Sequence, residues 1–249
     1  MKTDFQGVYL TIVIPVYNEA KRIRRTLKEV IDYLKSKNFV YEVLIVNDGS
    51  KDNTVEVVED FFKKGEFDSF SILDFKENRG KGFAVKQGML AAKGEYILFI
   101  DADSSAPIEE FDKFMAEFGK GFDIFIGTRK AKGEIRATNI PFHRAILGLG
   151  FSFLARQILA TNVWDFTCGF KCYQRNAVKP IFSRQILDGW SFDAEDLFLA
   201  HKLGFKVKEI PIRWNHYQED TKVNALKEVF KSGWELLKIR INDLRGLYR

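Results

Sequence analysis

The sequence predicts an α/β fold: a doubly wound, mainly parallel sheet with helices on both faces. Apolar runs of strand length alternate with helical patterns through the first half of the chain. Runs such as Tyr96-Ile-Leu-Phe-Ile100 are apolar without interruption, which is typical of strands buried on both faces. Polar clusters follow three of these runs directly. Because ligands bind beyond the carboxyl ends of strands in such sheets, we expect a ligand site at one edge of the sheet.

Local signals delimit the elements of the first half. Pro15 ends the first strand, Glu19 opens the first helix, and Gly49 makes a turn ahead of the second helix. The predicted strands are Leu10–Val16, Tyr41–Asn47, Phe70–Phe75, Glu95–Asp101 and Phe122–Gly127. The predicted helices are Ala20–Lys35, Thr54–Lys63, Gly80–Ala92 and Ile108–Phe118.

The second half is less regular, and no internal repeat or Pro/Gly-rich linker interrupts it. We expect one domain over residues 1–222, followed by a carboxyl-terminal basic amphipathic helix over residues 223–249. The elements predicted here are a basic loop at Arg129–Asn139, an apolar helix at His143–Ala160, strands at Phe166–Tyr173 and Lys206–Arg213, and a helix at Ala194–Leu203 that Gly204 caps.

The composition is that of an ordinary globular protein, with 46% hydrophobic and 29% charged residues among 249. Two cysteines, Cys168 and Cys172, are too few for a disulfide framework, and their spacing is a poor zinc signature. A reducing cytoplasm is therefore the expected setting. No stretch approaches the roughly 18 apolar residues that cross a bilayer, and the first residues lack the apolar core of a secretory signal. We expect no transmembrane segment.

The net charge of +5 and the pI near 9.0 suit anionic partners. Residues 223–249 interleave Lys and Arg with apolar side chains that include Phe230 and Trp234, which is the pattern of a basic amphipathic helix. We expect this helix to hold the protein peripherally at the cytoplasmic face of a membrane. No nucleic-acid motif or aromatic–basic platform accompanies the charge, so nucleic acid is not an expected partner.

Asp101-Ala102-Asp103 follows a buried run and offers two carboxylates one residue apart. Such a pair can share Mg²⁺ or Mn²⁺, whose remaining positions are filled by water and substrate phosphates. The metal then neutralises charge on a departing diphosphate. A solvated turn would give the same three letters, so the motif gains weight only from its place at a strand end.

Three further clusters lie at strand ends or helix starts. Tyr17 is placed to face a nucleobase, and Asp48 is placed to meet a base edge or a ribose hydroxyl, although both clusters equally suit turns and helix caps. Asn78-Arg-Gly-Lys-Gly82 is a Gly-rich helix entry, a natural anion site that offers Lys81 to a phosphate. Its spacing is neither a P-loop nor a dinucleotide fingerprint, which argues against kinase and dehydrogenase functions.

Five motifs stand in the same order as in a known family: Ile14-Pro-Val-Tyr-Asn-Glu19, Val46-Asn-Asp-Gly-Ser50, Asn78-Arg-Gly-Lys-Gly82, Asp101-Ala-Asp103 and Gly127-Thr-Arg129. In these motifs the chain resembles glycosyltransferase family two, whose fold is GT-A. Within the family it looks like the branch that transfers glucose or mannose to dolichyl phosphate. It looks closer to the glucosyl side in three later segments: Thr167-Cys-Gly-Phe-Lys171, Trp190-Ser-Phe-Asp-Ala-Glu195 and Ile210-Pro-Ile-Arg-Trp214.

The resemblance implies a catalytic domain with sites for a sugar donor, a metal and an acceptor phosphate. It implies a metal at Asp101 and Asp103, and an acceptor phosphate at Arg129 and Arg144. Sugar-donor contacts are implied at Pro15, Tyr17, Glu19, Val46, Asp48, Asp101, Ala102, Asp103 and Lys222, to which the helix entry adds Lys81. Ser105 and His216 stand where the mannosyl branch has Gln and Arg, which weakens a mannosyl assignment.

The implied function is an inverting transfer of a hexose, glucose favoured, from UDP-glucose to a polyprenyl or dolichyl phosphate. Because that phosphate is already ionised, it needs no base, and Asp103 with its metal and Arg129 are the expected catalytic residues. Mannosyl transfer from GDP-mannose is one alternative. Transfer to a saccharide hydroxyl is another, with Asp196 as base, although Asp193, Glu195 and Asp196 equally suit a helix start. A non-catalytic nucleotide-sugar binder is the third, and the intact D-x-D disfavours it.

Overall fold

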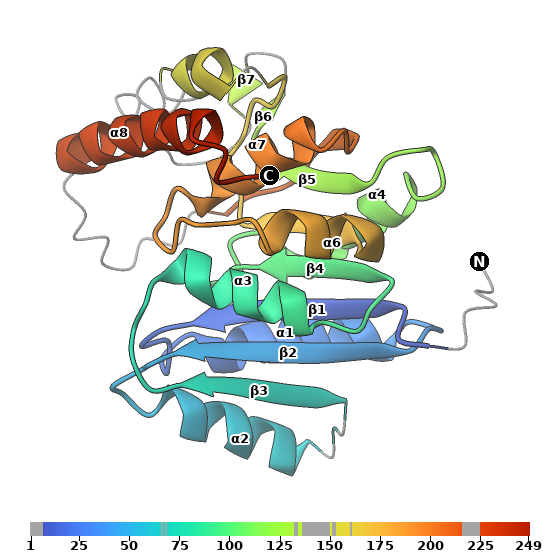
Figure 1. Ribbon diagram of the computed structural model, residues 1–249. Helices are drawn as coiled ribbons and strands as arrows, with labels where there is room; N and C mark the ends of the chain where they lie inside the picture. Colours follow the sequence, from blue (N-terminus) through green and yellow to red (C-terminus); the bar gives the residue numbers. More distant parts are fainter. Residues whose placement is uncertain are drawn as a thin grey trace.

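The computed structural model describes residues 7–65, 67, 69–131, 134–135, 150, 153–159, 161–215 and 225–249. Within these residues, seven strands form one sheet in the order β3-β2-β1-β4-β8-β5-β9 (Figure 1). Their bounds are β1 Leu10–Val16, β2 Tyr41–Asp48, β3 Phe70–Phe75, β4 Tyr96–Ile100, β5 Ile124–Thr128, β8 Phe170–Gln174 and β9 Val207–Pro211. Neighbours run parallel except at β8, which is antiparallel to both β4 and β5. The predicted α/β fold with a mainly parallel sheet is confirmed.

Helices cover both faces of this sheet (Figure 1). One face carries α1 Ile23–Lys35, α2 Thr54–Lys64, the short 3-10 helix η1 Ile108–Glu110 and α4 Phe111–Met115; the other carries α3 Lys81–Ala91, α6 Arg175–Phe182 and α7 Phe192–Lys202. Successive residues of a strand point to opposite faces. On β1, accordingly, Ile12 and Ile14 lie in the core under α1, whereas Val13 lies in the core under α3. Burial on both faces accounts for the uninterrupted apolar runs of the sequence.

Several segments differ from the prediction. The helix expected at Ile108–Phe118 is divided into η1 and the short α4. A pair of two-residue strands, β6 Lys130–Ala131 and β7 Glu134–Ile135, lies within the expected loop at Arg129–Asn139. Helix α6 is absent from the prediction, and Pro180 within it removes a helical hydrogen-bond donor, which weakens the sequence pattern. Of the helix expected at His143–Ala160, residues 153–159 are helical and most of the rest lies outside the described residues.

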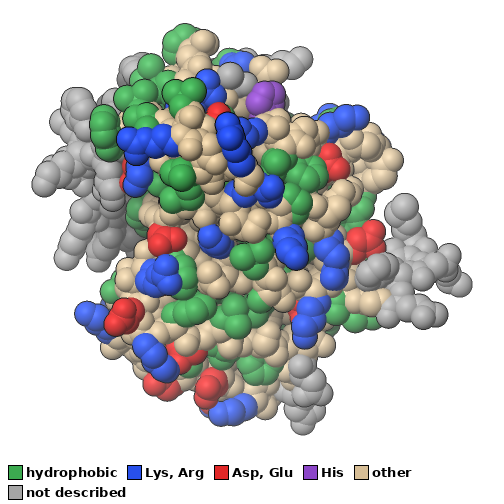
Figure 2. All heavy atoms as spheres, in the orientation of Figure 1, with side chains coloured by type: hydrophobic (Ala, Val, Ile, Leu, Met, Phe, Trp, Pro, Cys, Tyr) green, Lys and Arg blue, Asp and Glu red, His purple; other side chains and the backbone are tan. Residues whose placement is uncertain are grey.

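The carboxyl-terminal helix α8, Ala225–Leu244, packs beside α7. Leu236 and Ile239 are fully buried in this contact, and Asp243 forms an ion pair with Lys202 of α7. A second row of apolar side chains is exposed: Trp234, Leu237, Ile241 and Leu244. Figure 2 shows hydrophobic side chains gathered around this end of the molecule with Lys and Arg beside them. Trp234, which the sequence marked as part of the apolar face, therefore lies in the exposed row and not in the row that packs on α7.

No helix in the described ranges is long and apolar enough to span a membrane. The domain boundary expected after residue 222 falls outside the described residues and stays a prediction.

Candidate active site

Four predicted site residues lie at strand ends along one edge of the sheet. Tyr17 follows β1, Asp48 ends β2, Asp101 follows β4 and Arg129 follows β5. These strands run in the same direction, so their carboxyl ends meet at the same edge. Strand β8 runs the other way, and it is therefore its first residues that reach this edge. The sheet thus brings together charged groups from distant parts of the sequence.

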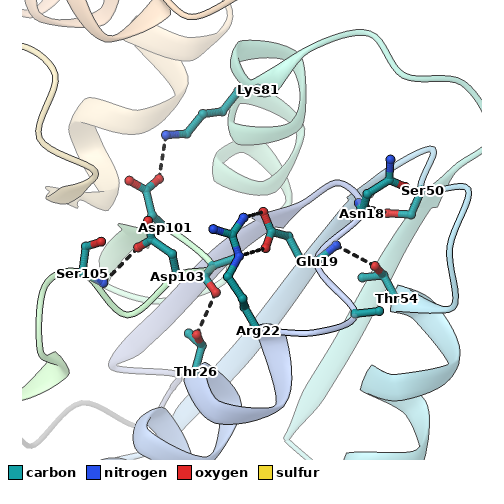
Figure 3. A network of polar contacts seen from close by, with 12 residues as sticks. Asn18, Glu19, Arg22, Thr26, Ser50, Thr54, Lys81, Asp101, Asp103 and Ser105 are labelled. Carbon is teal, nitrogen blue, oxygen red and sulfur yellow. Dashed lines mark hydrogen bonds and ion pairs between the residues drawn. The ribbon is translucent and has the colours of Figure 1, made fainter. Parts of the chain in front are cut away.

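The turn at Asp101–Ser105 is held from α1 (Figure 3). The hydroxyl of Thr26 donates a hydrogen bond to the carbonyl oxygen of Ala102 over 2.7 Å and accepts one from the Ser104 hydroxyl over 2.9 Å. Ser104 has φ 55°, a left-handed conformation that costs about 1–2 kcal/mol in a residue other than glycine. Ala102 is buried, and this anchoring leaves both aspartates partly exposed at the edge of the sheet.

The two carboxylates of the turn have different partners. Asp103 Oδ1 accepts a hydrogen bond from the Ser105 amide over 2.9 Å. Asp101 Oδ1 lies 2.6 Å from Nζ of Lys81, the first residue of α3 (Figure 3). Burial raises the pKa of Asp101, and the neighbouring ammonium of Lys81 opposes that rise. The same ammonium lies 5.0 Å from the centroid of the Trp190 ring.

These residues fit a hard divalent cation. A cation, the Lys81 ammonium, already lies against Asp101, and Asp103 is free of any ion pair with another described residue. Burial raises the pKa of Glu19, and Asp103 and Asp101 add to the rise, so a third acid lies within electrostatic reach. No three His, Cys, Asp or Glu side chains are grouped to hold an ion among the described residues. Two carboxylates leave ligand positions to water and substrate phosphates, as Mg²⁺ and Mn²⁺ commonly accept.

The turn after β1 is tied to the start of α2 (Figure 3). Asn18, with φ 55°, donates its amide hydrogen to Ser50 Oγ over 2.9 Å, and the Glu19 amide donates to Thr54 Oγ1 over 2.8 Å. The Glu19 carboxylate accepts two hydrogen bonds from Arg22, the residue before α1, over 2.6 and 2.7 Å. Tyr17 keeps 40% of its surface exposed and is accessible to a ligand.

Asp48 faces the helix entry at residues 78–80. Only 2% exposed, its carboxylate accepts hydrogen bonds from the Asn78 side chain over 2.9 Å and from the amides of Arg79 and Gly80 over 3.0 and 2.8 Å. Burial raises the pKa of Asp48, and the two amide donors oppose the rise. The predicted contact of Asp48 with a nucleoside stays a prediction. In this structure Asp48 fixes the loop that leads into Lys81.

Arg129 is held by a buried acid. Its amide and its Nε each donate to Asp165 Oδ2 over 2.9 Å, and its Nη2 donates to Asp165 Oδ1 over 2.7 Å and to Thr167 Oγ1 over 2.9 Å. The guanidinium carbon lies 4.9 Å from the centroid of the Trp214 ring. The hydrogen bonds of the guanidinium to Asp165 and Thr167 use Nε and Nη2, and 19% of the side chain is exposed, so the edge of the guanidinium that carries Nη1 is the edge proposed to meet a ligand.

The three acids at the start of α7 all lie in the interior. Asp193 forms an ion pair with Lys171 of β8, and Asp196 accepts a hydrogen bond from the Tyr173 hydroxyl over 2.5 Å. Glu195 accepts hydrogen bonds from backbone amides and from a tyrosine hydroxyl. Burial raises the pKa of Asp196 to about 7. At 1% exposure, Asp196 has structural partners, and its role as a base stays a prediction.

Two predicted site residues, Arg144 and Lys222, lie outside the described residues. Pro15 and Val46, predicted to contact the nucleoside, are buried and pair in register between β1 and β2. Asp165 and Glu209 stand in no motif of the sequence, and Gly169 and Lys171 are predicted only as members of the segment Thr167-Cys-Gly-Phe-Lys171, with no role of their own. One signal was available for Lys171: a lysine inside the apolar run Phe170-Lys-Cys-Tyr173 implies a buried charge that needs a partner.

Comparison with known proteins decides the family. Residues 11–182 match the model of glycosyl transferase family 2. The chain belongs to glycosyltransferase family 2. The dolichyl-phosphate beta-glucosyltransferase of Drosophila melanogaster is 33% identical and covers 99% of this chain and 78% of its own; the enzyme of the same name from Saccharomyces cerevisiae is 34% identical, with coverages of 99% and 78%.

A solved structure shares the fold of this family 2 chain. Glucosyl-3-phosphoglycerate synthase from Mycobacterium tuberculosis, in complex with Mn²⁺, UDP and phosphoglyceric acid, has a TM-score of 0.64 at 16% identity and covers 95% of this chain and 78% of its own. The predicted family and its GT-A fold are confirmed, and the chain is a glycosyltransferase.

Proposed function

We propose that this glycosyltransferase moves glucose from UDP-glucose to the phosphate of dolichyl phosphate, with inversion at the anomeric carbon. Both relatives described above bear the name dolichyl-phosphate beta-glucosyltransferase. A β-linked product from an α-linked sugar donor requires a single direct displacement. Ser105 and His216, at positions where the mannosyl branch has Gln and Arg, support glucose over mannose.

One observation carries the proposal: acids and a guanidinium occupy two halves of the same sheet edge. Asp101 and Asp103 follow β4, and Arg129 follows β5, with the start of β8 between these strands. Transfer between two phosphate-bearing substrates needs two separate anion sites, one for the departing diphosphate and one for the attacking phosphate. A cation on the two acids serves the first, and Arg129 serves the second.

Arg129 is proposed to hold the acceptor phosphate through the guanidinium edge that carries Nη1. Its other donors are fixed on Asp165 and Thr167, so the guanidinium meets the phosphate in one orientation. Alignment of two reactants can lower the activation free energy by up to about 7–11 kcal/mol. The acceptor phosphate is already ionised near neutral pH and needs no general base. The interior position of Asp196 therefore favours a phosphate acceptor over a saccharide hydroxyl.

Mg²⁺ or Mn²⁺ is proposed to bind at Asp101 and Asp103. When bound, such an ion neutralises charge on the leaving diphosphate. The Mycobacterium tuberculosis relative in complex with Mn²⁺ and UDP supports this assignment. Lys81, on the first turn of α3 beside Asp101, adds an ammonium and a helix amino terminus for the phosphates of the sugar donor.

A lipid-borne acceptor also requires that the protein meet a membrane surface. The exposed row of α8, with Trp234, Leu237, Ile241 and Leu244, is proposed to lie on that surface. Aromatic and aliphatic side chains on one side of a helix, flanked by Lys and Arg, are typical of interfacial helices. Lys238 and Arg245 are exposed beside this row.

A product assay tests the proposed function. The protein is incubated with UDP-glucose or GDP-mannose, with Mg²⁺ or Mn²⁺, and with a short dolichyl phosphate, and the organic phase is then analysed. We expect a β-linked glucosyl lipid phosphate from UDP-glucose. Transfer only from GDP-mannose would reassign the sugar, and label in a water-soluble glycan would reassign the acceptor. Binding of the nucleotide sugar without any transfer would reduce the protein to a binder.

A further inference from the structure

A single short segment, Asp165–Gly169, touches both halves of the site. At its start, Asp165 is 0% exposed and accepts three hydrogen bonds from Arg129, two of them in a fork from the guanidinium. Thr167 accepts a fourth. A buried carboxylate with this geometry fixes both the position and the plane of the guanidinium.

The start of the segment is in turn held by the sheet. Glu209 of β9 accepts hydrogen bonds from the amides of Trp164 and Asp165, each over 3.0 Å. On β9, Glu209 pairs in register with Ile126 of β5, the strand that leads to Arg129. Arg129 and the acid that clamps it are therefore positioned from the same pair of strands.

The end of the segment lies against Asp101. The Asp101 amide donates a hydrogen bond to the Gly169 carbonyl oxygen over 3.2 Å. A Cβ atom on Gly169 would lie 2.0 Å from Asp101 Oδ2 and 2.3 Å from its Cγ. Such contacts are far inside van der Waals distance, so the carboxylate occupies its place only because residue 169 has no side chain.

The direction of β8 explains this arrangement. Because β8 is antiparallel and lies between β4 and β5, the residues before it pass along the site edge from the end of one strand to the end of the other. A parallel strand in this place would bring its last residues to the edge instead. The segment is therefore a continuous stretch of five residues whose first residue binds Arg129 and whose last residue contacts Asp101, the first acid of the D-x-D.

We propose that Asp165–Gly169 is a positioning element that sets Arg129 and Asp101 relative to each other. Asp165 is the positioning residue for Arg129, with Glu209 behind it, and Gly169 is the positioning residue for Asp101. The identity of the substrate at each end rests on the proposed function, but the coupling of Asp165 to Arg129 and of Gly169 to Asp101 does not.

The first test is a double-mutant cycle of Arg129→Ala, Asp165→Asn and the two combined. For Asp165→Asn we expect KM for a short dolichyl phosphate to rise by about 10- to 100-fold, with the affinity for UDP unchanged. The double variant should be no worse than Arg129→Ala alone, because Asp165 acts through Arg129. Effects that multiply would overturn the role of Asp165. If both variants instead weaken UDP binding together, the coupling stands and the acceptor assignment of Arg129 fails.

Glu209 provides a conservative control in the same chain of contacts. Glu209→Gln keeps a side-chain oxygen for the two amides and should retain the wild-type KM for the lipid phosphate. Glu209→Leu removes the acceptor and should reproduce the KM of Asp165→Asn. Equal KM values for the two Glu209 variants would contradict the proposal that Glu209 positions Asp165 and, through it, Arg129.

The second test is Gly169→Ala, read by Mn²⁺ binding in electron paramagnetic resonance and by UDP binding in calorimetry. The new methyl group displaces the Asp101 carboxylate, and we expect Mn²⁺ affinity to fall by about 10- to 100-fold, as on loss of a group that orients a metal ligand. Gly233→Ala is the matched control, because nothing lies within 4 Å of its Cβ position. Unchanged Mn²⁺ affinity in a folded Gly169→Ala protein would overturn the role of Gly169.

Discussion

Among the acids of the site, Asp103 makes the fewest contacts with other described residues. Its carboxylate accepts one hydrogen bond, from the Ser105 amide, and it is partly exposed. We therefore expect Asp103→Ala to fold normally, as judged by circular dichroism. Sugar transfer should fall by about 10²–10³, the range typical of losing one group that stabilises transition-state charge. Asp32→Ala, which removes an exposed acid on α1, is the control. Full transfer in EDTA, or in Asp103→Ala, would refute metal dependence.

Lys81 contacts Asp101, the carboxylate that is also proposed to bind the divalent ion. The ammonium lies 2.6 Å from Asp101 Oδ1, where it repels a second cation. Lys81→Met should accordingly raise the affinity for Mn²⁺ in the absence of nucleotide and lower the affinity for UDP. Electron paramagnetic resonance measures the first and calorimetry the second. If Mn²⁺ affinity stays constant in the variant, the ammonium and the ion occupy separate places.

Arg129 has a structural contact with Asp165 and a proposed contact with the acceptor phosphate, and two substitutions separate the two roles. Arg129→Ala removes an ion pair with the buried Asp165, and breaking a buried pair costs up to about 3–5 kcal/mol of the free energy of unfolding. Arg129→Lys keeps a positive charge beside Asp165 and loses the fork. For Arg129→Lys we expect a folded protein whose KM for lipid phosphate rises, or whose kcat falls, by one to two decades, about 1.5–3 kcal/mol. Loss of UDP affinity instead would move Arg129 to the sugar-donor side.

At the scale of one element, α8 supports a prediction about membranes. Its exposed row includes Trp234, which is 65% exposed, and Leu237, which is 45% exposed. Each nearby Lys or Arg contributes about 1 kcal/mol of attraction to an anionic surface, and salt weakens it. We expect salt-sensitive sedimentation with anionic liposomes, reduced when Trp234 and Leu237 are both replaced by Ser.

The control for α8 is Val40→Ser, which removes an exposed apolar side chain far from this helix in the fold. It should bind liposomes like the wild type. A wild-type protein that does not bind anionic liposomes at low salt would contradict the peripheral model and weaken the case for a lipid acceptor.

The elements from β1 to β4 follow from the sequence because each is a local pattern. The run Leu10–Val16 and the helix over Ile23–Lys35 are apolar at the spacing that their burial requires. The direction of β8 does not follow, since the same apolar run suits a strand in either direction. Helix α6 does not follow from the sequence either, because Pro180 lowers the local helix propensity. Packing against the sheet stabilises the helix instead.

The site was predictable only where its residues form short motifs. Asp101 and Asp103 are separated by one residue in the sequence. Asp165 and Arg129 are 36 positions apart, and Glu209 and Asp165 are 44 positions apart. No local pattern relates such partners. The same limit applies to Asp48, whose hydrogen bonds to residues 78–80 appear only once the strands are in place.

For the whole molecule, the buried acid Asp196 predicts how stability depends on pH. Its pKa rises from 3.8 to about 7, chiefly through burial. Between these values the unfolded chain releases the proton that the folded chain keeps, so the contribution of Asp196 to stability is complete below about pH 4 and is lost as the pH rises through 7. Asp196→Asn stays uncharged and can still accept the Tyr173 hydrogen bond.

Thermal or urea unfolding of both proteins from pH 4 to pH 8 measures this contribution. We expect the stability of Asp196→Asn relative to the wild type to increase from pH 4 to about pH 7 and to level off above it. A difference that stays constant with pH would show that Asp196 titrates at the same pH in the folded and unfolded chains.

The chain leaves the site edge at Arg129 and returns to it at Asp165, and these two residues form an ion pair. Every proposed contact with the sugar donor except Lys222 precedes Arg129 in the sequence. We therefore expect a change of sequence between residues 130 and 164 to alter transfer to the acceptor while it leaves the proposed nucleotide contacts in place.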